Sequence, residues 1–190
     1  MDHDIIQFGL YVPPHPHPLL SPGASEGYQR LRDAFDTCRE RIENSDADLI
    51  IVYSTTWPSI IGHQFQANPN SEWVHVDDDF HYLGSMPYSF TMDSVFAEAC
   101  VEKAKERGLQ ARTVNYDAFP IDTGSITALS LLNPENRIPA TIVSSNMYAN
   151  RSETIVLGKA IRDALTEEKR KAVVVVCLLY TSPSPRDVSR

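Results

Sequence analysis

Short continuous apolar runs alternate with amphipathic segments along this chain, and this alternation is the feature that most constrains its fold. Runs rich in β-branched and aromatic residues predict strands at residues 5–12, 48–53, 111–116, 139–145 and 171–176. Apolar residues at three- and four-residue steps predict helices at residues 25–44, 93–107, 125–132 and 152–165. Continuous apolar strands are typical of sheets that are covered on both faces. The sequence therefore predicts an α/β fold with a mostly parallel central sheet and helices on both faces.

The charge and composition of the chain argue against several functional classes. The chain has 17 Lys and Arg against 25 Asp and Glu, a net charge of −8, which disfavours binding to the phosphate backbone of nucleic acid. No apolar run approaches the ~20 residues of a membrane-spanning helix, and the acidic start does not resemble a signal peptide. Cys38, Cys100 and Cys177 have no disulfide or metal-binding spacing, which favours buried thiols in a reducing compartment. We therefore expect a cytoplasmic protein that binds neither nucleic acid nor membrane.

The last residues differ from the rest of the chain. Residues 177–190 have no periodicity, although they follow a strand that should lead into a loop at the sheet edge. They resemble translated adapter sequence, and a genuine disordered terminus is the alternative. We expect residues 1–176 to form one incomplete domain, truncated at its C-terminus, and residues 177–190 to be a non-native tail.

Candidate site residues follow two of the predicted strands, where parallel sheets bind their ligands. His15 and His17 lie on a proline-rich loop after the first strand, where they either bind a divalent metal or form a solvated turn. Thr56 and Trp57, after the second strand, are candidates for binding a planar aromatic ligand. His63 is either a further metal ligand or a hydrogen-bonded structural residue.

Two further segments carry polar residues of interest. Asp122 or Thr123 fits the N-cap of the helix predicted from residue 125, and the free backbone N–H groups at a helix start also favour an anionic ligand. Residues 75–81 contain three consecutive aspartates between two histidines; we expect a solvated acidic surface, with metal binding as the alternative. The sequence contains no G-x-S-x-G, P-loop or G-x-G-x-x-G motif, so we expect neither a hydrolase of that type nor nucleotide binding by those routes.

In their order along the chain, these segments resemble a known enzyme family. The proline and histidine loop is followed by residues 52–57 (VYSTTW), 74–77 (VHVD), 115–117 (NYD), 119–124 (FPIDTG) and 144–146 (SSN). This order is similar to that of the class III extradiol ring-cleaving dioxygenases, and most similar to the alpha subunits of the aminophenol dioxygenases among them. The resemblance covers nearly all of residues 5–176.

The resemblance implies a chemistry based on non-haem Fe(II). In this family two histidines and one carboxylate hold the iron, which the aromatic substrate chelates before dioxygen opens the ring. The likeness places the first metal ligand at His15 or His17 and the second at position 56, where this sequence has Thr56. A hydroxyl replaces an imidazole poorly at ferrous iron. Thr123 stands where the family often has a His or Tyr near the substrate, so Thr56, Trp57 and Thr123 are the implied substrate contacts.

Three functional hypotheses follow. In the first, the chain is an alpha-type subunit that does not hold iron itself and pairs with a homologous, catalytic beta-type subunit in the cleavage of a small aromatic substrate. In the second, it is an active Fe(II) enzyme whose divergent metal site is built from the three histidines named above. In the third, it is a small aromatic-binding module that uses Trp57, Phe65 and Tyr148 without redox chemistry.

Overall fold

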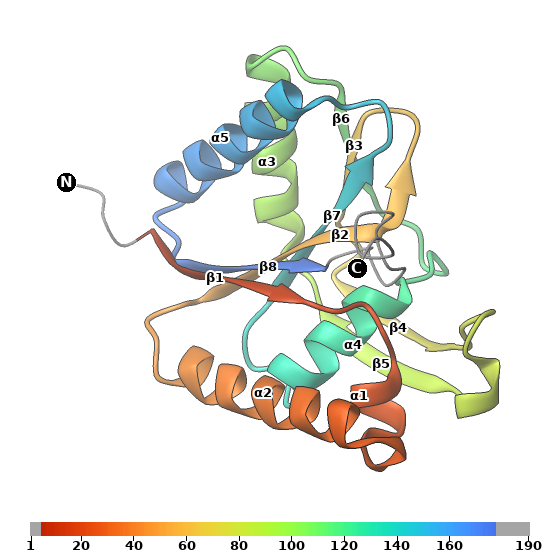
Figure 1. Cartoon of the computed structure of the whole chain (residues 1–190). Helices are drawn as coiled ribbons and strands as arrows, with labels where there is room; N and C mark the ends of the chain where they lie inside the picture. The colour runs from red at the N-terminus through yellow and green to blue at the C-terminus, as the bar shows by residue number, and fades with distance from the viewer. Residues whose placement is uncertain (1–4, 178–190) are drawn as a thin grey trace, which may run out of the picture.

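The computed structural model describes residues 5–177, which form a six-stranded sheet flanked by helices, with a separate two-stranded hairpin (Figure 1). The strand order is β1-β8-β2-β7-β3-β6. All neighbouring strands are parallel except β3 and β7, which pair antiparallel at Phe65 and Val143. The predicted mostly parallel sheet is therefore confirmed. Its strands are β1 (Ile6–Val12), β2 (Leu49–Ser59), β3 (His63–Gln66), β6 (Ala111–Val114), β7 (Ala140–Asn146) and β8 (Ala172–Cys177).

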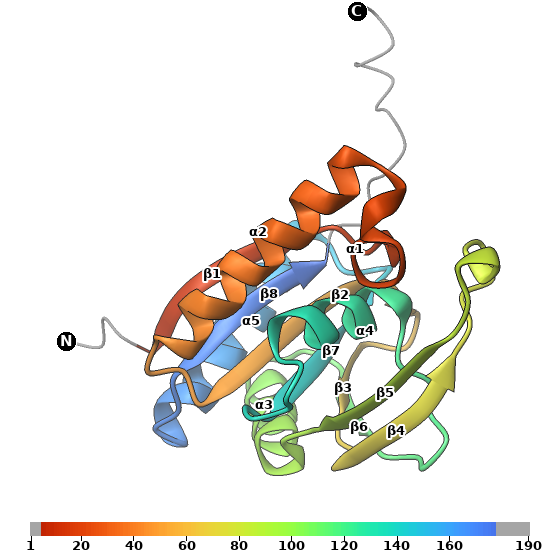
Figure 2. The ribbon, with the colours of Figure 1, turned by 90° about the horizontal axis from the view of Figure 1, so that it is seen from below.

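Helices cover both faces of this sheet, as predicted (Figures 1 and 2). The helices are α1 (His17–Leu20), α2 (Glu26–Glu43), α3 (Ser94–Glu106), α4 (Thr123–Leu132) and α5 (Arg151–Glu167), with 3₁₀ turns η1 (Pro22–Ala24) and η2 (His81–Leu83). On β2, Ile50 and Val52 join the core formed with α2 and α4, whereas Leu49 and Ile51 join the core formed with α3 and α5. A strand buried on both faces needs an unbroken apolar run, which is why the run after residue 48 predicts it correctly.

The hairpin is the main element that the sequence analysis missed. The sequence predicts no strand that begins between residues 54 and 92, yet this stretch contains β3 and two antiparallel strands, β4 (Asn70–His75) and β5 (Met86–Thr91). Met86, Tyr88 and Phe90 of β5 are buried in the core formed with α4, while the residues between them are exposed. Figure 2 shows the two strands running out past α4 toward the η2 turn.

Capping side chains place the helix starts close to their predicted positions. Ser25 caps α2 by accepting a hydrogen bond from the backbone N–H of Tyr28. At α5 the helix begins one residue earlier than predicted, because Asn150 and Glu153 form a capping box.

The end of β8 differs from its prediction by one residue, because Cys177 pairs with Val12 and Ser54. All three cysteines are free; Cys100 and Cys177 are buried and Cys38 is half-buried. Between residues 5 and 177, no helix has both the length and the apolar character needed to cross a membrane. The predicted tail beyond residue 177 and the acidic residues 1–4 lie outside the described residues.

Candidate functional site

A pocket of about 410 Å³ opens at the carboxyl edge of the sheet, where parallel sheets bind their ligands. The loop after β1, the far end of β2, the start of α4 and the β4–β5 connection meet there. Three predicted site residues line this pocket: His15, Thr56 and Thr123. The other lining residues are Pro14, His75, Val76, Asp77, Asp78, Asp79, Phe80 and Asp122.

Asp122 joins β2 to α4 at one wall of the pocket. Its Oδ2 accepts hydrogen bonds from the Thr56 hydroxyl at 2.5 Å, the Ser54 hydroxyl at 2.9 Å and the backbone N–H of Ser125 at 2.9 Å. Its Oδ1 accepts from the Ser125 hydroxyl at 2.8 Å. Each carboxylate oxygen has two lone pairs, so Oδ2 is fully used by its three donors, whereas Oδ1 keeps one lone pair. The predicted N-cap at Asp122 is confirmed, and the same carboxylate also holds the Thr56 side chain.

Gly124 allows α4 to approach β2 this closely. A Cβ atom at this position would lie 2.7 Å from Thr56 Oγ1 and 3.0 Å from Pro14 Cβ. Any larger residue would therefore push α4 away from both β2 and the loop after β1. Gly124, the glycine of the FPIDTG segment, is therefore required for the close packing of α4 against β2 at the pocket.

Thr123 connects α4 to the end of β4. Its hydroxyl donates to the carboxylate of Asp77 and lies 2.9 Å from Nε2 of His75. Because a hydroxyl carries a single proton, His75 Nε2–H must be the donor in the second bond. In an activated nucleophile the histidine instead accepts the hydroxyl proton. In this arrangement the Thr123 hydroxyl links the start of α4 to His75 and Asp77 and is not activated by His75.

The same contacts correct the expectation for residues 75–81. Asp78 and Asp79 are exposed, as a solvated surface requires, but His75 and Asp77 are half-buried and bonded to Thr123. The VHVD segment was part of the family resemblance, yet its residues carried no assigned role. Only the fold brings them to a threonine that is distant in the sequence.

The two loop histidines lie among aromatic rings. His17 stacks on Tyr28 with ring centroids 4.2 Å apart, and Phe80 meets His17 and His15 edge-on at 5.2 and 5.3 Å. The Tyr82 hydroxyl lies 3.4 Å from His17 Nε2. Burial, with the charge of His15 acting in the same direction, lowers the pKa of His17. The ring of His17 is therefore packed against the β4–β5 connection.

His63 and Trp57 lie apart from these histidines. His63 begins β3, is buried, and donates its backbone N–H to Gln110 at 2.8 Å. Trp57 packs on Phe119 with centroids 5.4 Å apart and contributes to the core formed with α4. Neither residue is among those that line the pocket.

The aromatic residues of the third hypothesis also occupy different environments. Phe65 is completely buried in the core formed with α3 and α5, so it cannot contact a ligand. Tyr148 is instead exposed after β7. Trp57, Phe65 and Tyr148 therefore do not form a shared binding face, because Phe65 is enclosed in the core while Tyr148 is exposed on another segment.

The buried imidazole of His63 links folding to pH. Burial lowers its pKa below the ordinary 6.5, against a smaller opposing effect of the Glu153 charge. As the pH falls through about 6.5, the unfolded chain binds a proton that folded His63 excludes, so the free energy of unfolding decreases. We expect the thermal midpoint to fall between about pH 7.5 and pH 5.5, with a smaller slope in His63→Asn.

The exposed His81 provides the control for this measurement, since His81→Asn should keep the full slope. The pKa of His17 is lowered in the same direction, so a residual slope should remain in His63→Asn. An unchanged slope in His63→Asn would contradict the role of His63.

The described donor set does not fit the ferrous iron that the family resemblance implies. The Thr56 hydroxyl donates to Asp122, and Oδ2 of that carboxylate is already used by three donors. Of the three predicted histidine ligands, only His15 lines the pocket. Among residues 5–177, no three His, Cys, Asp or Glu side chains are grouped to hold a metal ion.

Several known proteins are similar to this chain in amino-acid sequence. Residues 9–177 match the LigB family, described as "Catalytic LigB subunit of aromatic ring-opening dioxygenase". The chain is 31% identical over 166 residues to the 2-aminophenol 1,6-dioxygenase alpha subunit of Pseudomonas sp, with 87% of this chain and 60% of that protein covered. It is 30% identical over 180 residues to the corresponding beta subunit, with 87% and 59% covered. The chain thus spans about three fifths of the length of these curated relatives.

A solved structure shares the fold. The crystal structure of uncharacterized protein JW3007 from Escherichia coli K12 matches with a TM-score of 0.60 at 15% identity, covering 88% of this chain and 58% of that one. The predicted resemblance to ring-cleaving dioxygenases is confirmed by the family match and by the two subunit relatives. The chain belongs to the LigB family of aromatic ring-opening dioxygenase subunits.

Proposed function

We propose that this chain is the non-catalytic, alpha-type subunit of an extradiol dioxygenase that opens the ring of a catechol or an aminophenol. The observation that carries the proposal is the side chain of Thr56, which donates to Asp122 at 2.5 Å where the family resemblance implies a metal-binding histidine. Two relatives named as alpha and beta subunits of one enzyme support the existence of a partner. In this proposal the homologous beta-type subunit supplies the iron and the oxygen chemistry.

Under this proposal, the polar residues of the pocket stabilise its walls. Ser54, Thr56 and Asp122 hold the end of β2 against α4, and Thr123 holds the end of β4. These bonds keep the pocket walls in place without the ligands that iron needs. The same proposal places the subunit in the cytoplasm, which the three free thiols support, and keeps residues 177–190 as a non-native tail.

Iron content and ring cleavage test the proposal. The chain is expressed alone and together with the homologous metal-bearing subunit from the same source, loaded anaerobically with Fe(II), and assayed with 2-aminophenol and catechol. Alone, we expect far less than one iron per chain and no ring cleavage, because the donor set is incomplete. Together, we expect a complex that binds iron and opens the ring.

Histidine variants assign any iron that binds. His15→Ala, His17→Ala and His63→Ala remove the predicted ligands one at a time, and His81→Ala removes an exposed histidine as the control. The complex should keep its activity in His15→Ala. Stoichiometric iron on the single chain, lost in His15→Ala and retained in His81→Ala, would refute the proposal in favour of an active enzyme.

A further inference from the structure

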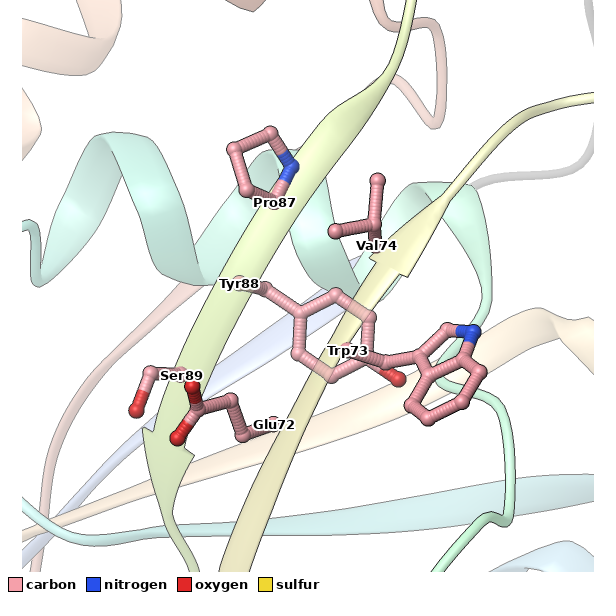
Figure 3. Close-up of a pocket in the computed structure, with 6 residues that line it drawn as sticks. All are labelled: Glu72, Trp73, Val74, Pro87, Tyr88 and Ser89. Atoms are coloured by element: carbon pink, nitrogen blue, oxygen red, sulfur yellow. The ribbon is translucent and has the colours of Figure 1, made fainter.

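The β4–β5 hairpin exposes large apolar side chains that a water-facing surface normally avoids. Trp73 is 60% exposed, Val74 54% and Tyr82 66%, and Val76 between them is exposed as well. Figure 3 shows the indole of Trp73 projecting from the side of β4 that faces away from β5. Glu72 and Val74 share the outer face of the hairpin with Pro87, and Trp73 borders this face at the open edge of β4. We call these residues, with Val76 and Tyr82, the hairpin surface.

The hairpin surface contains a groove, and one edge of β4 has no strand paired to it within residues 5–177. A groove of about 880 Å³ is lined by Glu72, Trp73, Val74, Pro87, Tyr88 and Ser89 (Figure 3). Within residues 5–177, β4 pairs with β5 and with no other strand. Open strand edges and clustered tryptophan and tyrosine are typical of surfaces that another chain covers.

The charged residues of the β4–β5 hairpin and its connection are all acidic. Glu72 lines the groove, and Asp77, Asp78 and Asp79 follow Val76 directly in the sequence. No Lys or Arg occurs anywhere between Arg41 and Lys103. A second copy of this chain would bring two such acidic margins together, and like charges across an interface disfavour association.

We propose that the hairpin surface is the docking site for the catalytic partner subunit, which meets it with an apolar centre surrounded by Lys and Arg. This inference rests on the proposed function, because it assigns the surface through which the alpha-type subunit joins its partner. Apolar burial around Trp73 and Val74 supplies the affinity, and the acidic margin selects the partner over a second copy of this chain.

Binding of the purified partner subunit to variants of the full chain tests the inference. Val74→Asp places a charge in the apolar centre and should weaken binding by about tenfold or more. Ile155→Asp is the matched control, because Ile155 on α5 is 50% exposed, and it should change the dissociation constant by less than about twofold.

A second pair of variants tests the acidic margin while leaving the apolar residues in place. Glu72→Lys should weaken binding, and more strongly at low than at high salt, because screening reduces charge contributions. Glu98→Lys makes the same change of charge at an exposed position on α3 and should have little effect. Circular dichroism of all four variants establishes that each is folded.

The outcomes separate the inference from the proposed function. A complex that is unaffected by Val74→Asp and Glu72→Lys overturns the inference and leaves the proposed function standing. A partner that does not bind the unmodified chain overturns the proposed function and the inference with it. If the chain dimerises by itself and Val74→Asp dissolves the dimer, the surface belongs to a second copy and the inference is wrong.

Discussion

Asp122→Ala should lower the free energy of unfolding by about 3–4 kcal/mol, since it removes a helix cap and charge-assisted bonds to two β2 hydroxyls. The carboxylate is half-buried and accepts from Ser54, Thr56 and both the backbone and side chain of Ser125. For a chain of this size, such a loss lowers the thermal midpoint by roughly 10 °C. Urea unfolding followed by circular dichroism measures it directly.

Asn150→Ala is the control for the capping contribution alone. Asn150 caps α5 by accepting from Glu153 at 3.0 Å, at an exposed position without bonds to a neighbouring strand. Asn150→Ala should lower the free energy of unfolding by about 1 kcal/mol. Asp122→Asn should fall between the two, because asparagine also caps helices but lacks the charge. Equal losses for Asp122→Ala and Asn150→Ala would mean that the bonds to β2 add nothing to stability.

Gly62→Ala should destabilise the protein by about 2–4 kcal/mol, the second large effect that we expect. Gly62 has φ +86°, and a Cβ there would lie 2.5 Å from the backbone oxygen of Gln110. That oxygen accepts the hydrogen bond from His63 N–H at 2.8 Å where β3 meets β6. Because the clash is with backbone, relief requires the two strands to separate.

Gly108→Ala isolates the conformational part of this effect. Gly108 has φ +80°, close to that of Gly62, but no atom lies within 4 Å of its added Cβ. It should cost only about 1 kcal/mol, the usual penalty for alanine in the left-handed region. If chemical denaturation gives the same loss for both variants, the packing of Gly62 on Gln110 contributes nothing.

The parallel sheet could be predicted because its central strands are buried on both sides and so must be apolar throughout. β5 was missed although Met86, Tyr88 and Phe90 alternate with exposed residues, because Pro87 argues against a strand. β4 has weaker signals still, since Asn70, Ser71 and Glu72 are poor strand formers. Pairing with β5 and packing against α4 decide its conformation.

In the candidate site, contacts within one segment could be predicted from the sequence, whereas contacts between distant segments could not. The cap at Asp122 is local, and its sequence position is enough to predict it. The meeting of Thr123 with His75 and Asp77 joins residues nearly fifty positions apart, so no pattern within one segment predicts it. His63 illustrates the same limit, because β3 turns it into the core and away from His15.

The β4–β5 connection belongs to the pocket and to the hairpin surface at the same time. Val76 is exposed beside Trp73, the next residue Asp77 is bonded to Thr123, and Phe80 packs on His15. One short peptide segment, residues 75–80, therefore forms a wall of the pocket and continues directly from β4. If the partner proposed above binds the hairpin and thereby changes the affinity of the pocket for a ligand, thermodynamic reciprocity requires that ligand to change the affinity of the hairpin for the partner by the same factor.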